Sequence, residues 1–159
     1  MQLRLLSRSP SETEALGEEL GRILEGGEIL ALCGELGSGK TTFVRGLARG
    51  LGVNEEIVMS PSFTLLNEYP GRVNLYHFDF YRLGGLEELE SIGFWDYLGE
   101  GIVTVEWADR IPEAIPEDAL WITFLIVDDD RREIDLKGER GKGRGLVEGL
   151  MAKGYNLGC

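Results

Sequence analysis

Apolar and polar positions along the first part of the chain predict a strand, a helix and a second strand. Residues 3–7 and 28–33 are short apolar runs, which is typical of strands. Residues 11–24 instead carry apolar residues at helical spacing. Ser11 and Glu14 form an S-x-x-E pattern that predicts a capping box at the start of this helix, and a glycine pair after it predicts its end.

Helical spacing returns directly after the second strand. In residues 40–52, three apolar residues fall on one helical stripe: Phe43, Leu47 and Leu51. Residues 85–98 predict a helix in their first half, and a short helix is expected around residues 145–153.

Two segments predict antiparallel hairpins. Residues 63–79 contain two apolar stretches joined by a Pro-Gly pair, and residues 119–138 contain two joined by a run of three aspartates. Residues 101–107 predict a further buried strand. The whole pattern predicts one α/β domain over residues 1–159, in which helices flank a mixed, mainly parallel central sheet that includes antiparallel hairpins.

The stretch GELGSGKTTF, residues 34–43, fits the Walker A pattern G-x-x-x-x-G-K-[ST]. Gly37 and Gly39 would let backbone N–H groups turn inward on a phosphate. Lys40 would place its charge on the β- and γ-phosphates, and the Thr41 hydroxyl would bind Mg²⁺. The motif lies between a predicted strand and a predicted helix, whose N-terminal dipole favours anions. This context favours a P-loop NTPase-type three-layer domain over a plain glycine-rich turn.

Two acidic residues stand at the carboxyl ends of predicted strands. Asp79 ends one apolar strand and Glu106 ends another. Ligands of open α/β sheets bind beyond those ends, so either carboxylate could hold Mg²⁺ or orient an attacking water. The alternative for each is a carboxylate that simply faces solvent.

Hydroxyl side chains follow the predicted phosphate-loop helix, at Ser60, Ser62 and Thr64. P-loop proteins often carry a γ-phosphate-sensing loop there, and a serine-proline turn is the equal alternative.

His77 is the only histidine. No serine or cysteine is placed with it as a triad requires, so packing or bonding within its strand is favoured over catalysis.

Composition excludes several classes of function. The formal net charge is −12, so strong direct binding of nucleic acid is not expected. No apolar run approaches the ~20 residues of a membrane span, and the N-terminus does not resemble a secretory signal. Cys33 and Cys159 form neither a disulfide framework nor a metal-site spacing. These features predict a cytoplasmic protein without a membrane partner.

Three functional classes fit a phosphate loop in this context: an ATPase that drives a partner complex, a small-molecule or nucleoside kinase, and a GTP-dependent switch. A kinase needs a second substrate pocket and usually an arginine-bearing lid, and no such insertion is evident. The switch is disfavoured because the sequence lacks N-K-x-D and D-x-x-G segments.

Five segments, in their order and spacing, carry a resemblance: GELGSGKTT, SPSFTLLNEY, YHFDFYRL, ELESIGFWDYL and VEW. Together they resemble the TsaE family, bacterial ATPases needed for threonylcarbamoyladenosine formation on tRNA. The resemblance covers residues 11–107 and then thins to RREIDL. It implies ATP and Mg²⁺ as cofactors and work with the partner proteins TsaB and TsaD. Slow hydrolysis by the isolated chain is expected for a separate reason: no arginine is identified by its position as the arginine finger that rapid phosphoryl transfer often uses. TsaD carries out the transfer, so tRNA would be met only indirectly.

The resemblance also implies roles for single residues. Phosphate binding falls to Gly37, Ser38, Gly39, Lys40, Thr41 and Thr42. Magnesium falls to Thr41 and Glu106, with Asp79 as the Walker B acid, and catalysis is expected from Lys40, Asp79 and Glu106.

Four further residues are expected at the nucleotide. Ser60 and Ser62 stand in the loop where the family reads S-P-T, so Ser62 replaces a threonine and keeps the hydroxyl. Trp107 follows the acid as in the family's E-W pair, and Arg132 resembles an arginine of the family's C-terminal hairpin. The glycine-rich stretch KGERGKGRG departs from the family's pattern.

Overall fold

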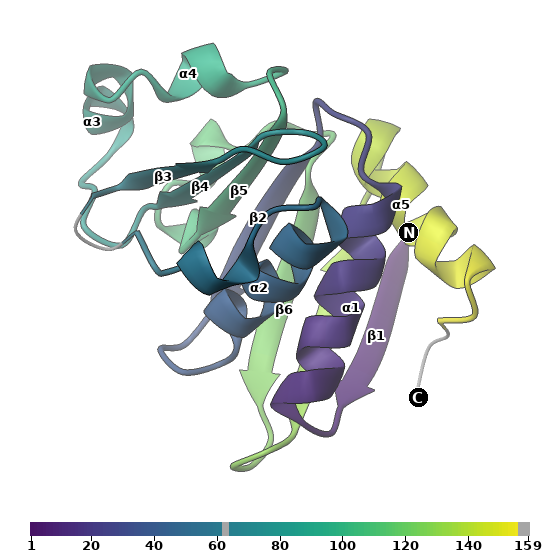
Figure 1. Ribbon diagram of the computed structural model, residues 1–159. Helices are drawn as coiled ribbons and strands as arrows, with labels where there is room; N and C mark the ends of the chain where they lie inside the picture. The colour runs from purple at the N-terminus through teal and green to yellow at the C-terminus, as the bar shows by residue number, and fades with distance from the viewer. Residues whose placement is uncertain (62–63, 156–159) are drawn as a thin grey trace.

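The computed structural model describes residues 1–61 and 64–155, which form a seven-stranded sheet flanked by helices (Figure 1). The strands are β1 (Gln2–Ser7), β2 (Ile29–Gly34), β3 (Leu66–Tyr69), β4 (Leu75–Asp79), β5 (Ile102–Glu106), β6 (Leu120–Ile126) and β7 (Arg132–Lys137). The helices are α1 (Pro10–Ile23), α2 (Lys40–Gly50), α3 (Leu86–Ser91), α4 (Phe94–Tyr97) and α5 (Gly141–Ala152). Short 3₁₀ turns occur at Glu55–Ile57, Ala108–Arg110 and Pro112–Ala114.

The sheet has the strand order β1-β7-β6-β2-β5-β4-β3. The middle strands β6, β2, β5 and β4 are parallel to one another. The edges are antiparallel, because β3 pairs with β4, and β7 pairs with both β6 and β1. This arrangement confirms the predicted mixed sheet and both predicted hairpins. It also brings the carboxyl ends of the parallel strands to one edge of the sheet.

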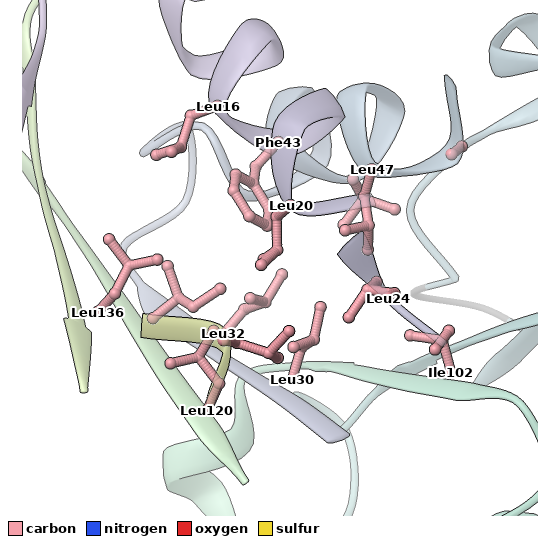
Figure 2. Packing of buried hydrophobic residues seen from close by; sticks show 14 of the residues in the cluster. Leu16, Leu20, Leu24, Leu30, Leu32, Phe43, Leu47, Ile102, Leu120 and Leu136 are labelled. Carbon is pink, nitrogen blue, oxygen red and sulfur yellow. The ribbon is translucent and has the colours of Figure 1, made fainter. Parts of the chain in front are cut away.

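Helices α1, α2 and α5 cover one face of the sheet, and α3, α4 and the 3₁₀ turns after β5 cover part of the other. Figure 2 shows Leu20 and Phe43 of the helices lying over Leu30 and Leu32 of β2. All four side chains are fully buried. Burial of such a side chain is worth about 1.5–3 kcal/mol, so β2 is held firmly in the middle of the sheet.

Helix α1 packs directly against α2, and small residues make this close approach possible. A Cβ atom on Gly46 of α2 would overlap the Glu14 carbonyl oxygen of α1, and one on Gly17 would overlap the Phe43 carbonyl oxygen. The contact brings Thr13 of α1 beside Gly39, where α2 begins.

The predicted capping box at Ser11 and Glu14 was wrong. Helix α1 begins at Pro10 and is capped by Ser9, whose Oγ accepts a hydrogen bond of 3.1 Å from the Glu12 N–H. Proline suits the first helical position because it lacks an N–H and has a helical φ, so it moves the start of the helix toward the N-terminus.

Two further boundaries differ from the prediction. The segment of residues 85–98 continues as a second helical turn, α4, after Gly93 adopts a left-handed conformation with φ of 72°. The glycine-rich stretch after β7 joins it to α5, which begins at Gly141, earlier than predicted. There the Gly143 N–H donates to the Asp118 carbonyl at 2.8 Å.

No helix in the described part of the chain has the length and apolar character to cross a bilayer.

Candidate functional site

A cavity of about 570 Å³ opens at the carboxyl ends of β2, β4 and β5. Its lining includes residues from the phosphate loop, the start of α1, the ends of β4 and β5, and the hairpin between β6 and β7. Ten of the lining residues are ones that the sequence singled out: Gly37, Gly39, Lys40, Thr41, Thr42, Ser60, Asp79, Glu106, Trp107 and Arg132.

The phosphate loop connects β2 to α2. Gly39 is the N-cap of α2 with φ of 106°, and Gly37 has φ of 80°. Both angles lie in the left-handed region that favours glycine. The N-cap residue Gly39 makes no side-chain capping hydrogen bond, so the positive end of α2 faces the cavity without a capping side chain. The loop therefore has the backbone geometry of an anion site.

Lys40 is the first residue of α2, and its side chain is almost completely buried, with 5% of the residue exposed. Its Nζ donates to the Gly34 carbonyl at 2.5 Å and lies 3.6 Å from the centre of the Trp107 ring. Burial lowers the pKa of the Lys40 ammonium, and the nearby carboxylates of Glu106, Asp79 and Asp109 oppose that shift. The charge thus lies inside the cavity, held by one carbonyl and one aromatic face.

Trp107 follows β5 directly and forms part of the cavity wall. Its φ of 57° and ψ of 38° are left-handed, which is uncommon for a bulky residue and is seen most at functional sites. The Tyr81 ring lies 4.9 Å from the Trp107 ring, and the Arg110 guanidinium lies over Tyr81 at 5.5 Å. These side chains form an aromatic wall beside Lys40.

Asp79 and Glu106 end neighbouring parallel strands and are paired positions of the β4–β5 register. Both are buried, with 2% and 3% of the residue exposed, and both line the cavity. Asp79 Oδ1 accepts a hydrogen bond of 2.8 Å from the Tyr81 N–H. Glu106 Oε2 lies 2.6 Å from His77 Nε2. The solvent-facing alternative is therefore wrong for both carboxylates.

Arg132 lines the cavity from the start of β7, but its donors are directed at backbone carbonyls. Nε donates to Ser38 O and Nη2 to Gly37 O, each at 3.2 Å. Nη1 donates to Asp128 O at 2.6 Å. Arg132 thus joins the tip of the β6–β7 hairpin to the phosphate loop, and its expected contact with a nucleotide stays a prediction.

The other hydroxyl residues that the sequence predicts at the nucleotide do not all line the cavity. Thr41, Thr42 and Ser60 line the cavity. Ser38 is fully buried under the loop, and its Oγ has no hydrogen-bond partner among the described residues. Ser62 lies outside the residues that the structure describes.

Several lining residues were missed by the sequence prediction: Pro10, Thr13, Leu36 and Tyr81. Tyr81 lies two residues after Asp79, so its place in the turn after β4 gave a signal. Pro10 and Thr13 gave none, because only the packing of α1 on α2 brings the start of α1 to the cavity. The contact of His77 with Glu106 likewise depends on the pairing of β4 with β5.

Across residues 1–61 and 64–155, no three His, Cys, Asp or Glu side chains converge closely enough to hold a metal ion by themselves. Mg²⁺ usually takes one or two protein oxygens and completes its shell with water and substrate phosphates. The hydroxyl of Thr41 and the carboxylates of Asp79 and Glu106 are oxygen ligands of the kind that such a shared site uses.

Comparison with known proteins agrees with this geometry. The family model described as threonylcarbamoyl adenosine biosynthesis protein TsaE matches residues 7–134. A tRNA threonylcarbamoyladenosine biosynthesis protein TsaE from Treponema pallidum is 45% identical over 133 residues, covering 83% of this chain and 98% of the relative. The protein of the same name from Bacillus subtilis is 42% identical over 135 residues, covering 84% of each chain.

A solved structure is also similar. The crystal structure of Bacillus subtilis YdiB superposes with a TM-score of 0.78 and 36% sequence identity, covering 96% of each chain. The similarity therefore extends over nearly the whole chain.

Proposed function

The chain belongs to the TsaE family, and from this premise we propose that it binds and hydrolyses Mg-ATP in support of threonylcarbamoyladenosine formation on tRNA. The observation that carries the proposal is the meeting of Lys40, Asp79 and Glu106 in one cavity at the phosphate loop. The role in tRNA modification comes from the names of the relatives. The proposed place of action is the cytoplasm.

Phosphate binding is the first step that these residues support. The left-handed glycines leave the loop without side chains where a phosphate would lie, and α2 directs its positive end there. The cavity volume falls within the range of small-molecule sites. Lys40 would exchange the Gly34 carbonyl and the Trp107 ring for phosphate oxygens, which bind an ammonium more strongly because they are charged.

Magnesium would be held by the Thr41 hydroxyl together with the carboxylates of Asp79 and Glu106, directly or through water. Bound there, it would neutralise charge on the phosphate oxygens. The same carboxylates would orient the attacking water, since both are buried and line the cavity beside the loop.

Partner dependence is the finer part of the proposal. Rapid phosphoryl transfer by P-loop enzymes commonly uses an arginine directed at the transferred phosphate. Three donors of Arg132 are directed instead at carbonyls of the loop and the hairpin. We expect slow hydrolysis by the isolated chain and a change in rate or affinity when TsaB and TsaD are added, with tRNA met only through that complex.

The experiment measures phosphate release from Mg-ATP and Mg-GTP by the purified chain, alone and with TsaB and TsaD. The expected result is preference for ATP, slow turnover alone, and an altered rate with the partners. GTP preference, or transfer of the phosphate to a small acceptor, would favour the switch or the kinase. The proposal fails if pull-down shows no association in any nucleotide state and modified adenosine forms over many turnovers without this chain.

A further inference from the structure

We propose that His77 is a positioning residue that holds the Glu106 carboxylate in the orientation required for Mg-ATP turnover. The inference rests on the proposed function and assigns a role to the only histidine of the chain. His77 itself is not part of the cavity lining, whereas Glu106 is. Any effect of His77 on a bound nucleotide must therefore pass through another side chain.

The contact between the two residues is short and buried. His77 Nε2 lies 2.6 Å from Glu106 Oε2, and the two side chains are 0% and 4% exposed. The backbone determines their approach: β4 and β5 are parallel, His77 is paired with Thr104, and Glu106 follows two residues later on the same face of β5. His77 therefore lies two residues before Asp79 on the same face of β4 and reaches Glu106 from further back along the strands, whereas the cavity lies at their carboxyl ends.

The direction of the hydrogen bond follows from the chemistry of the partners. A carboxylate that binds Mg²⁺ is ionised and only accepts hydrogen bonds, so the proposed role requires the tautomer in which His77 Nε2 carries the proton and donates a hydrogen bond to Glu106 Oε2. With Oε2 held in this way, the second oxygen of Glu106 remains for the cavity. A glutamate has three rotatable bonds, and a fixed oxygen removes most of that freedom before a ligand arrives.

Folding alone does not account for polar side chains at these positions. The neighbouring residues on the same face of the sheet include Leu30, Leu32 and Ile102, all fully buried. His77 Nδ1 and Thr104 Oγ1 are buried and have no hydrogen-bond partner among the described residues. An unpartnered buried polar atom is unfavourable, and an apolar residue would avoid it. The His77–Glu106 contact is thus better explained by the site that it supports.

The His77–Glu106 contact also affects how Glu106 interacts with the charge of Lys40. Glu106 is the strongest of the carboxylates that act on the Lys40 ammonium. A Glu106 side chain released from His77 would be free to pair directly with Lys40, which would withdraw both groups from phosphate and Mg²⁺. His77 therefore keeps Glu106 and Lys40 available as separate groups.

The test uses substitutions that separate the donor from the volume of the ring. His77→Leu keeps an apolar side chain of useful size and removes the donor, whereas His77→Gln retains an N–H donor at about the reach of Nε2. Thr104→Val is the matched control, because it changes the paired buried position on β5 without touching the His77–Glu106 contact. Turnover number, Mg²⁺ required for half-maximal rate, nucleotide affinity without Mg²⁺ and thermal unfolding are measured for each.

We expect His77→Leu to lower kcat by about 10- to 100-fold, the range typical of residues that orient a ligating group, and to raise the Mg²⁺ requirement. Nucleotide affinity without Mg²⁺ should change less than about threefold, because the loop backbone supplies it. His77→Gln should recover most of kcat, and Thr104→Val should remain within about twofold of the parent. In a Glu106→Gln background, His77→Leu should have no additional effect on kcat.

A His77→Leu variant with the parent's kcat and Mg²⁺ requirement overturns the inference, as do independent effects of His77→Leu and Glu106→Gln. If His77→Leu fails to fold, the comparison of His77→Gln with His77→Asn decides, because the shorter amide does not reach Glu106; equal activity of those two also overturns it. A parent chain without turnover, with or without TsaB and TsaD, overturns the proposed function and this inference together. An active parent with an unaffected His77→Leu overturns the inference alone.

Discussion

The Lys40 ammonium lies over the face of the Trp107 ring, 3.6 Å from its centre, while donating to the Gly34 carbonyl. A cation on an aromatic face is attracted by the ring, most strongly when both are partly desolvated. The arrangement keeps a buried charge satisfied at the phosphate loop. It also links the position of that charge to a residue with strong intrinsic fluorescence.

Lys40→Ala should reduce kcat/KM for Mg-ATP by about 100-fold or more, because the lost charge stabilises the developing charge on the phosphates. The far-ultraviolet circular dichroism spectrum should stay unchanged. Addition of ATP to the parent should alter the tryptophan emission as Lys40 leaves the Trp107 ring, and Trp107→Phe should lose this change. Unchanged hydrolysis by Lys40→Ala would contradict the assignment of the phosphate loop.

Asp79→Asn should raise the Mg²⁺ needed for half-maximal turnover more than it weakens nucleotide binding. The amide keeps the size of the side chain and an acceptor for the Tyr81 N–H, but it lacks the negative charge that attracts a divalent cation. A Mg²⁺ titration of the ATPase rate measures the shift, with Asp129→Asn on the exposed hairpin tip as the control. Identical titrations for Asp79→Asn and the parent would exclude a metal role.

Arg132→Ala should weaken ATP binding about tenfold, or about 1.4 kcal/mol, because the carbonyls of Gly37 and Ser38 lose their donors and the loop loses its tie to the hairpin. The control is Arg131→Ala, which removes an exposed arginine paired with Asp128. Isothermal titration with ATP compares the two. Equal affinities for both variants would show that the tie to the loop is without consequence for binding.

Gly46→Ala should lower the free energy of unfolding by about 1–3 kcal/mol, because its new methyl group would overlap the Glu14 carbonyl oxygen and push α1 away from α2. Gly145→Ala in α5 is the matched control, since a Cβ there meets open space and the change should stabilise the helix by about 0.5–1 kcal/mol. Urea unfolding of both variants measures the difference. A Gly46→Ala variant as stable as the parent would mean that the helices can separate freely.

Cys33 should make stability depend on pH in the alkaline range. Burial, with the nearby Asp109 carboxylate, raises the pKa of the Cys33 thiol from 9.0 to about 12. The unfolded chain releases this proton as pH rises above 9 and the folded chain does not, so the contribution is intact below pH 9 and is lost progressively up to about pH 12. The loss should approach about 1.4 kcal/mol per pH unit.

Urea unfolding of the parent and of Cys33→Ala at pH 8, 9 and 10 isolates the contribution of the Cys33 thiol to the free energy of unfolding, because all other titratable groups are common to both chains. The stability of the parent relative to the variant should be constant from pH 8 toward 9 and then fall. A difference that stays constant over the whole series would show that the folded thiol ionises normally.

The order of the elements and the phosphate loop could be predicted from the sequence because both depend on local patterns. Residues of β2 form a short continuous apolar run, which is typical of a buried strand. Phe43, Leu47 and Leu51 instead recur at the spacing of one face of a helix. The loop depends on glycines and a lysine at fixed spacing. The helix start at Pro10 was missed although its signal is local, because a second serine with a suitable glutamate lay nearby.

Strand order and the partners of each buried polar group were decided only by the tertiary structure. The sequence shows that Asp79 and Glu106 end strands, but only the pairing of β4 with β5 makes them neighbours. The same pairing joins His77 to Glu106, and the packing of α1 on α2 brings Thr13 to the cavity. Local patterns identify which residues can form an element and carry chemistry. Contacts between distant segments depend on how the sheet is assembled, because burial of apolar area favours any close packing and only the complete set of neighbours selects one.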